Sequence, residues 1–278
     1  MRPAHLAPIP DRPALELSVG PSGPGGTIVI ADVHLGLGST DAPTSVPPAA
    51  LARTMAWDLV SLGHERRARG FLIVGDVKHP IVGTPAGLRP VVFDFFSTLL
   101  HEGFAAEIIL GNHDVGLARW LPREVAVHPA RGLVRSGVGF FHGHRWPSNL
   151  VLRADRLVVG HLHPGYRFAP TEASPAMKQR CWVRVGLTPR AAKPRRKLRH
   201  GPVLARELIV LPAFNPIAGT EALNRERPAR GRSFLVHRFL SRGAPRAYLL
   251  DGTDVGEVLT GSRSAPRSVR AGRAKTDR

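Results

Sequence analysis

The sequence predicts an α/β fold in which β-sheets are flanked by helices. In the first half of the chain, short apolar runs alternate with helix-length segments, which is the pattern of strands joined by crossover helices. The second half holds further short apolar runs with little helical patterning between them, and this predicts additional strands. The chain has 278 residues, of which 43% are hydrophobic, so it can bury one substantial core.

The first half begins with a segment rich in Pro and Gly, residues 1–26, in which an edge strand is expected at 14–19. A helix is predicted over 49–69, because apolar residues recur there at helical spacing, and a second helix over about 91–101, closed by Gly103. Buried strands are predicted wherever a short apolar run is bounded by loop-forming residues, at 27–31, 71–74 and 105–110.

The second half is expected to be rich in strands. Apolar runs predict them at 138–141, 156–159, 181–185, 208–211, 234–236 and 247–250. A short helical piece is expected at 148–154, and residues from 261 onward are expected to be disordered. Together these elements predict one domain over 27–260, with a basic insertion near 187–206.

The formal net charge of +18 is concentrated in two segments. The stretch 184–206 contains eight Lys or Arg and no acid, and the tail 262–278 contains six Lys or Arg and one acid. Segments of this kind are suited to bind nucleic acid, although solvated basic runs also occur without any partner.

The composition argues against membrane and disulfide-bonded proteins. No apolar run approaches the roughly 20 residues that a membrane-spanning helix needs, and residues 1–13 lack the apolar core of a secretory signal. Cys181 is the only cysteine, which excludes an internal disulfide and argues against a thiolate metal site. A cytoplasmic protein with no membrane association is therefore expected.

Five apolar strands are each followed directly by polar side chains that can bind a metal. The clusters are Asp32 with His34, Asp76 alone, Asn112 with His113 and Asp114, His142 with His144, and His161 with His163. A single histidine after a strand is usually a hydrogen-bonded loop residue. The carboxyl ends of neighbouring strands meet at one edge of a sheet, however, where α/β proteins place their sites. We therefore expect the five clusters to converge.

The residue types in these clusters indicate transition metals. Imidazoles, carboxylates and one carboxamide, without thiolates, suit Mn²⁺, Fe or Zn²⁺ better than Mg²⁺ or Ca²⁺ bound by oxygen alone. The ligands suffice for two cations, and a carboxylate can bridge two cations about 3.5–4 Å apart that clamp a phosphoryl group. Asp76, which stands alone at the end of its strand, is the expected bridging ligand.

The order of these motifs resembles that of the calcineurin-like metallophosphoesterases. The matching blocks lie within about residues 27–164 and are D-V-H at 32–34, G-D at 75–76, G-N-H-D at 111–114, H-G-H at 142–144 and G-H-L-H at 160–163. The resemblance implies a sandwich of two mixed β-sheets flanked by helices. It also implies two divalent cations, with Mn²⁺ as the first expectation, and hydrolysis of phosphoesters by a hydroxide that bridges the metals.

The resemblance divides the metal ligands between the two cations. One cation would be held by Asp32, His34 and His163. The other would be held by Asn112, His142 and His161. Asp76 would bridge them.

Residues around these ligands would act on the substrate. In the family pattern, His113 faces the substrate and assists the leaving oxygen, and Asp114 orients His113 through a hydrogen bond. Four neighbours of the ligands are candidate substrate contacts: Lys78, His79, His144 and Arg145.

Within the family, three motifs look most like the SbcD-related, archaeal-type branch: D-V-H-L-G at 32–36, G-D-V-K-H at 75–79 and L-P-A-F-N-P-I-A-G at 211–219. Members of a neighbouring branch are associated with DNA ligases. This implies a nuclease or nucleotide phosphodiesterase with a role in DNA repair. Segments 37–41 and 191–200 depart from the family pattern near the place where a substrate would approach. The substrate range is therefore open, and a small-molecule phosphatase and a lipid-precursor pyrophosphatase are the alternatives. A non-catalytic metal-binding scaffold is a separate alternative, although such proteins usually lose ligands and every expected position is filled in this sequence. The oligomeric state is open.

Overall fold

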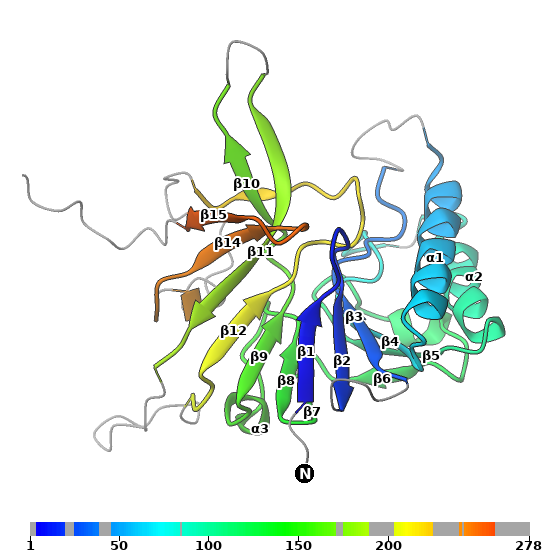
Figure 1. Cartoon of the computed structure of the whole chain (residues 1–278). Coiled ribbons are helices and arrows are strands. Elements are labelled where there is room, and N and C mark those ends of the chain that lie inside the picture. The colour runs from blue at the N-terminus through cyan, green and yellow to red at the C-terminus, as the bar shows by residue number, and fades with distance from the viewer. Residues whose placement is uncertain are drawn as a thin grey trace, which may run out of the picture.

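The structure is a computed structural model, and it describes residues 4–19, 25–38, 46–83, 85–170, 175–188, 203–224, 239–240 and 242–258. It contains a six-stranded and a nine-stranded sheet, both mixed, with two long helices packed on one side of the first sheet (Figure 1). This confirms the predicted α/β class with two mixed sheets flanked by helices. No helix in the described part of the chain is long and apolar enough to cross a membrane.

The first sheet has the strand order β1-β2-β3-β4-β5-β6. Its strands are β1 (Ala4–Pro8), β2 (Leu15–Val19), β3 (Thr27–Ile30), β4 (Gly70–Val74), β5 (Ala105–Ile109) and β6 (Ala126–His128). Strands β3 to β6 are parallel, and helices α1 (Pro48–Glu65) and α2 (Leu88–His101) make the crossovers that the sequence predicts. The predicted strand at 14–19 is present, but it is not at the edge, because β2 pairs with both β1 and β3.

The second sheet has the order β13-β10-β11-β12-β9-β8-β7, and β14 pairs with both β11 and β15. Its strands are β7 (Leu133–Arg135), β8 (Val138–Phe141), β9 (Arg156–Val159), β10 (Pro164–Phe168), β11 (Met177–Gly186), β12 (Glu207–Val210), β13 (Glu221–Ala222), β14 (Arg246–Leu249) and β15 (Asp254–Glu257). A short helix, α3 (Asn149–Leu152), and a 3-10 turn, η1 (Leu117–Trp120), complete the described elements. The predicted strand at 234–236, the stretch 189–202 and the tail from 261 lie outside the described residues.

The core is divided into layers by the sheets. One apolar cluster combines residues of both sheets, such as Val29 and Leu72 from the first and Phe140 and Val158 from the second, so it fills the space between them. A second cluster lies between the first sheet and helices α1 and α2, and a third covers the other face of the second sheet. Strands such as β4 and β8 are therefore buried along their whole length, which explains their continuous apolar sequences.

The layered arrangement brings the ends of strands from both sheets together. In the first sheet, Asp32 and His34 donate their backbone N–H groups to the carbonyls of Gly75 and Asp76, at 3.1 and 2.9 Å. Across the layers, the backbone N–H of His161 donates to Asp32 Oδ2 at 3.0 Å. The polar clusters after β3, β4, β5, β8 and β9 thus meet at one end of the sandwich.

Candidate metal centre

The seven residues predicted as metal ligands meet in two groups. In each of two trios, one ligand atom per residue lies within 4.8 Å of the others: Asp32, His34 and His163 form one trio, and Asp76, His142 and His161 form the other. Asn112 joins the second trio, because its Oδ1 is 3.2 Å from Nε2 of His142. The family resemblance assigns these same two sets of residues to two cations, and that assignment stays a prediction.

Asp76 lies between the two groups. Its Oδ2 is 3.8 Å from Nε2 of His34 in the first group and 3.1 Å from Nε2 of His142 in the second. The residue is 2% exposed. A single carboxylate oxygen therefore faces both groups, which is the position that a bridging ligand requires.

Backbone carbonyls orient two of the ligand imidazoles. Nδ1 of His142 is 2.9 Å from the Val74 carbonyl, and Nδ1 of His163 is 3.1 Å from the Gly219 carbonyl. A carbonyl only accepts hydrogen bonds, so each Nδ1 carries the proton and Nε2 is left facing the site. Metal-binding histidines are commonly held in this way.

The charge state of the ligands fits a pair of cations. Burial lowers the pKa of His34 to about 3 and that of His161 to about 4, so both imidazoles are in the neutral form that binds metals. Burial alone would also lower the pKa of His142, but the neighbouring carboxylate of Asp76 raises it to about 9. The buried carboxylates thus favour positive charge within the site, and bound divalent cations would supply it.

A buried nitrogen of His34 and the close approach of two imidazole nitrogens also indicate that cations would fit this site. His34 is 4% exposed, and its Nδ1 has no hydrogen-bond partner among the residues that the structure describes. Its Nε2 faces Nε2 of His163 at 3.1 Å, although two neutral imidazole acceptors repel each other at that distance unless a proton or a cation lies between them. The residues present therefore fit transition-metal ions bound by nitrogen and oxygen.

The backbone is strained at most of the ligand positions. In the described part of the chain, eight residues other than glycine have a positive φ. Five of the eight are predicted metal ligands: Asp32 (57°), His34 (45°), Asp76 (52°), His161 (71°) and His163 (45°). Such conformations cost about 1–3 kcal/mol each and concentrate at functional sites, so the fold maintains this geometry against a local penalty.

Two glycines allow the loops to approach one another closely. A Cβ atom on Gly75, which has φ +83°, would collide with the ring of His142. A Cβ on Gly111 would collide with the carboxylate and the backbone nitrogen of Asp76. The glycines of the G-D and G-N-H-D motifs are therefore needed for space next to ligands of the second group.

We expect Gly111→Ala to displace Asp76 and to lower metal affinity by about 10- to 100-fold, as loss of support around metal ligands typically does. Titration of the purified variant with Mn²⁺ measures this change. Gly186→Ala is the matched control, because nothing lies within 4 Å of a Cβ there. Equal metal affinity in the two variants would show that the tight contact at Gly111 does not position Asp76.

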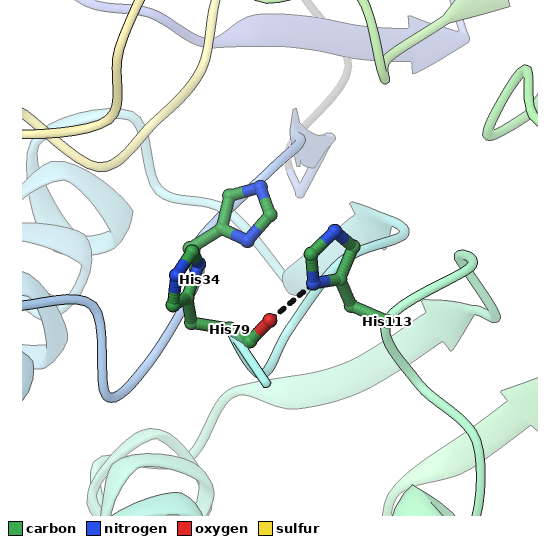
Figure 2. A group of neighbouring side chains, drawn as sticks. All are labelled: His34, His79 and His113. Carbon is green, nitrogen blue, oxygen red and sulfur yellow. Dashed lines mark hydrogen bonds between the residues drawn. The ribbon is translucent and has the colours of Figure 1, made fainter. Parts of the chain in front are cut away.

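Three histidines gather beside the bridging position (Figure 2). The ring centroids of His34 and His113 are 4.8 Å apart, and the rings of His79 and His113 stack at 5.8 Å. Nδ1 of His113 donates to the backbone carbonyl of His79, which leaves Nε2 facing the site at 3.7 Å from Asp76 Oδ2. The backbone N–H of His113 donates to Asp76 Oδ1 at 3.0 Å, and the ligand atoms of the three histidines lie within 4.8 Å of one another, so His113 is in direct contact with the ligand groups.

Asp114 has a different role from the predicted one. Its Oδ1 accepts the backbone N–H of Val77 at 2.9 Å and that of Lys78 at 3.3 Å, and its Oδ2 accepts that of Gly111 at 2.8 Å. Burial raises its pKa to about 6. The sequence predicts a hydrogen bond from Asp114 to His113, but the structure uses the carbonyl of His79 for that purpose. Asp114 instead ties the G-N-H-D loop to the segment that follows Asp76.

The four candidate substrate contacts lie in different surroundings. Lys78 is 1% exposed, and its ammonium group donates to the Pro80 carbonyl, so it supports the loop instead of presenting its charge to a substrate. His79 is half-buried beside His113. His144 is half-buried next to the second group, with its ring centroid 5.4 Å from that of His142, and burial lowers its pKa to about 4. Arg145 is exposed.

The structure adds Asn215 as a supporting residue that the sequence interpretation missed. Asn215 is fully buried, and its Nδ2 donates to the carbonyls of Val33 and His34 at 2.8 and 3.3 Å. It belongs to the motif at 211–219 that the sequence singles out, but a carboxamide bonded to a backbone has no sequence signature of its own. Through it, this loop braces the strained backbone at His34.

Comparison with known proteins gives no match to any family model, and no curated protein matches either. The solved structures to which the chain is similar include the following two. One is the nuclease MPE of Pseudomonas putida, with 16% identity and a TM-score of 0.48 over 89% of this chain and 98% of that chain. The other is Yfce, a phosphoesterase from E. coli, with 14% identity and a TM-score of 0.33 over 84% of this chain and 97% of that chain. Both TM-scores are below 0.5, so the case for a function comes from the residues of the site.

Proposed function

We propose that the chain is a metal-dependent phosphoesterase that uses a pair of divalent cations. The observation that carries the proposal is the position of Asp76, whose Oδ2 faces His34 of one ligand group at 3.8 Å and His142 of the other at 3.1 Å. Each group contains its own histidines and a share in a carboxylate, so each is suited to one cation.

We propose the division of ligands that the family resemblance implies. Asp32, His34 and His163 would hold one cation, and Asn112, His142 and His161 the other, with Asp76 shared. Mn²⁺ is the first choice, and Fe or Zn²⁺ would suit the same nitrogen and oxygen donors. When bound, such a pair polarises a phosphoryl group and activates water as a nucleophile.

His113 is the residue that we propose assists the leaving group. Its Nδ1 donates to the carbonyl of His79, and its Nε2 faces the site beside Asp76 without belonging to either of the two ligand groups that share Asp76. In the imidazolium form, in which both ring nitrogens carry protons, Nε2 can donate its proton to the departing oxygen of the phosphoester and leave the neutral imidazole with its proton on Nδ1. His79, through its carbonyl and its stacked ring, fixes the direction in which Nε2 points.

Phosphodiesters of nucleic acids or nucleotides are the proposed substrates. The net charge of +18 and the basic segments at 184–206 and 262–278 support a polyanionic substrate, although most of these two segments lies outside the described residues. Of the four candidate contacts, Arg145 is exposed and His79 and His144 flank the ligand groups, so these three are the proposed phosphate contacts.

A second candidate substrate is a phosphoester with an apolar leaving group, such as a lipid precursor. Ile81 and Val82, which follow His79 closely, are 52% and 89% exposed. Val115, which follows the G-N-H-D motif, is 73% exposed. Exposed apolar side chains on the two loops that carry His79 and His113 would favour an apolar group next to the leaving oxygen.

The experiment for the proposed function is a substrate panel with the Mn²⁺-loaded chain. It compares bis-p-nitrophenyl phosphate, p-nitrophenyl phosphate, cyclic nucleotides, a lipid pyrophosphate, and single- and double-stranded DNA, before and after treatment with a chelator. We expect hydrolysis of a diester that chelation abolishes and Mn²⁺ restores. Hydrolysis that is indifferent to chelation, or no hydrolysis of any member while metal is bound, would contradict the proposal, and the latter outcome would favour a non-catalytic scaffold.

A further inference from the structure

The hairpin formed by β10 and β11 carries basic residues on one of its faces. Its strands pair antiparallel, with Arg167 opposite Lys178 and Gly165 opposite Arg180. Directly paired residues lie on the same face of a sheet, and so do residues two apart along a strand. The three cationic side chains therefore share one face, and Figure 1 shows that the hairpin projects from the body of the molecule.

No described carboxylate forms an ion pair with these three side chains. Lys178 Nζ donates to the Thr220 carbonyl at 3.4 Å, and Arg180 donates to the carbonyls of Ala213 and Phe214 at 3.1 and 3.2 Å. Like charges placed directly opposite each other across two strands are destabilising. The pairing of Arg167 with Lys178 thus lowers the stability of the hairpin slightly, and an anion bound over both side chains would offset this repulsion.

The hairpin begins at the metal centre. His163, a ligand of the first group, directly precedes β10, and its Nδ1 donates to the carbonyl of Gly219. Gly219 also lines a pocket of about 570 Å³, whose hairpin side holds Lys178 and Arg180. Asp11 and Asp251 also line this pocket, and their carboxylates would repel an anion inside it, so the pocket is not the proposed binding site.

We propose that this basic face, formed by Arg167, Lys178 and Arg180, binds the sugar–phosphate backbone of a nucleic-acid strand next to the phosphodiester at the metal centre. The inference rests on the proposed function of that centre. Arg167 is four residues beyond His163, or about 13 Å along an extended strand. A dinucleotide is too short to reach from the ligands to Arg167, whereas a longer strand contacts both.

The test removes charge from the outer part of the face with Arg167→Gln and Lys178→Gln together. Arg180 is left intact, because it holds the loop that contains Ala213 and Phe214.

The matched control is Arg53→Gln with Arg153→Gln, which removes the same charge from exposed positions on α1 and beside α3. Each Mn²⁺-loaded protein is assayed on a dinucleotide and on a strand of about 20 nucleotides over a range of salt concentrations. Fluorescence anisotropy with a phosphorothioate version of the strand, which keeps the charge and resists hydrolysis, reports binding directly.

We expect the ratio of kcat/KM on the strand to kcat/KM on the dinucleotide to fall at least about tenfold at low salt in the hairpin variant. The slope of log affinity against log salt should become shallower by about one to two, and the control should match the wild type. An unchanged slope in the hairpin variant, or tighter binding of phosphatidylserine vesicles than of the strand through the same residues, would overturn the inference. If the wild-type chain binds the strand through the hairpin but hydrolyses no ester, the proposed function fails and the hairpin assignment stands.

Discussion

Replacing Asp76 with asparagine is expected to lower the hydrolysis of bis-p-nitrophenyl phosphate by at least about 1,000-fold, because one carboxylate oxygen serves both ligand groups. Asparagine keeps the size of the side chain but loses the negative charge that both cations need. Burial raises the pKa of Asp76, yet His142, His113 and His34 outweigh it and hold the pKa far below its usual range. The charge of this carboxylate is thus strongly favoured in the folded protein. Steady-state kinetics measure the loss of hydrolysis, and metal analysis of the same preparation measures the loss of bound cations.

The control for this substitution is Glu107→Gln. Glu107 is also a partly buried carboxylate that contacts a histidine, with its Oε2 2.7 Å from His128 Nε2, but it lies outside the metal groups. We expect it to leave metal content and turnover close to those of the wild type. Asp76→Asn protein with normal metal content and normal turnover would contradict the bridging role.

Replacing His113 with asparagine should leave both cations bound and still reduce turnover by about 10²–10⁴-fold, which is the usual contribution of a general acid. The loss should depend on the substrate. A diester with a poor alkyl leaving group needs protonation of the departing oxygen, whereas p-nitrophenolate leaves without it, so the alkyl ester should lose more. Comparing the two leaving groups in wild-type and variant protein measures the role of the histidine directly.

His128→Asn provides the matched histidine control, since His128 pairs with Glu107 away from the ligand groups. If His113→Asn loses metal, then His113 is a ligand and the assignment is incorrect. An equal loss on both leaving groups, with metal retained, would instead show that the residue binds substrate without assisting departure.

The sequence predicts the buried strands well, because a strand that is buried on both faces consists almost entirely of apolar residues. Strands β8 and β9 match the predicted ranges at both ends, since both lie inside the sandwich and read as continuous apolar runs. Strand β6 was missed because it is short and largely exposed, and β10 was missed because it begins with Pro and Gly. Helix α1 was predicted to reach residue 69, but it ends at Glu65, just before Arg67 adopts a positive φ.

The sequence predicts that the ligand residues meet at one place, but it does not predict the hydrogen bonds that orient their side chains. Ligand residues follow strand ends, and the strand order alone places them at one end of the sandwich. The contacts that orient them involve the backbone carbonyls of Val74, His79 and Gly219, and any residue type supplies a carbonyl. For the same reason, Asp114 was assigned to the neighbouring ring when its oxygens in fact bind three backbone N–H groups. The burial of Lys78 likewise depends on the path of the loop after β4.

Electron paramagnetic resonance of the Mn²⁺-loaded chain tests the shared carboxylate most directly. Two Mn²⁺ ions bridged by Asp76 are magnetically coupled, so at about two ions per chain the spectrum should be that of a spin-coupled pair. Asp76→Asn should convert this spectrum to that of isolated ions, and Glu107→Gln should not. A wild-type spectrum that shows only isolated Mn²⁺ at every loading would contradict a two-cation centre built on Asp76.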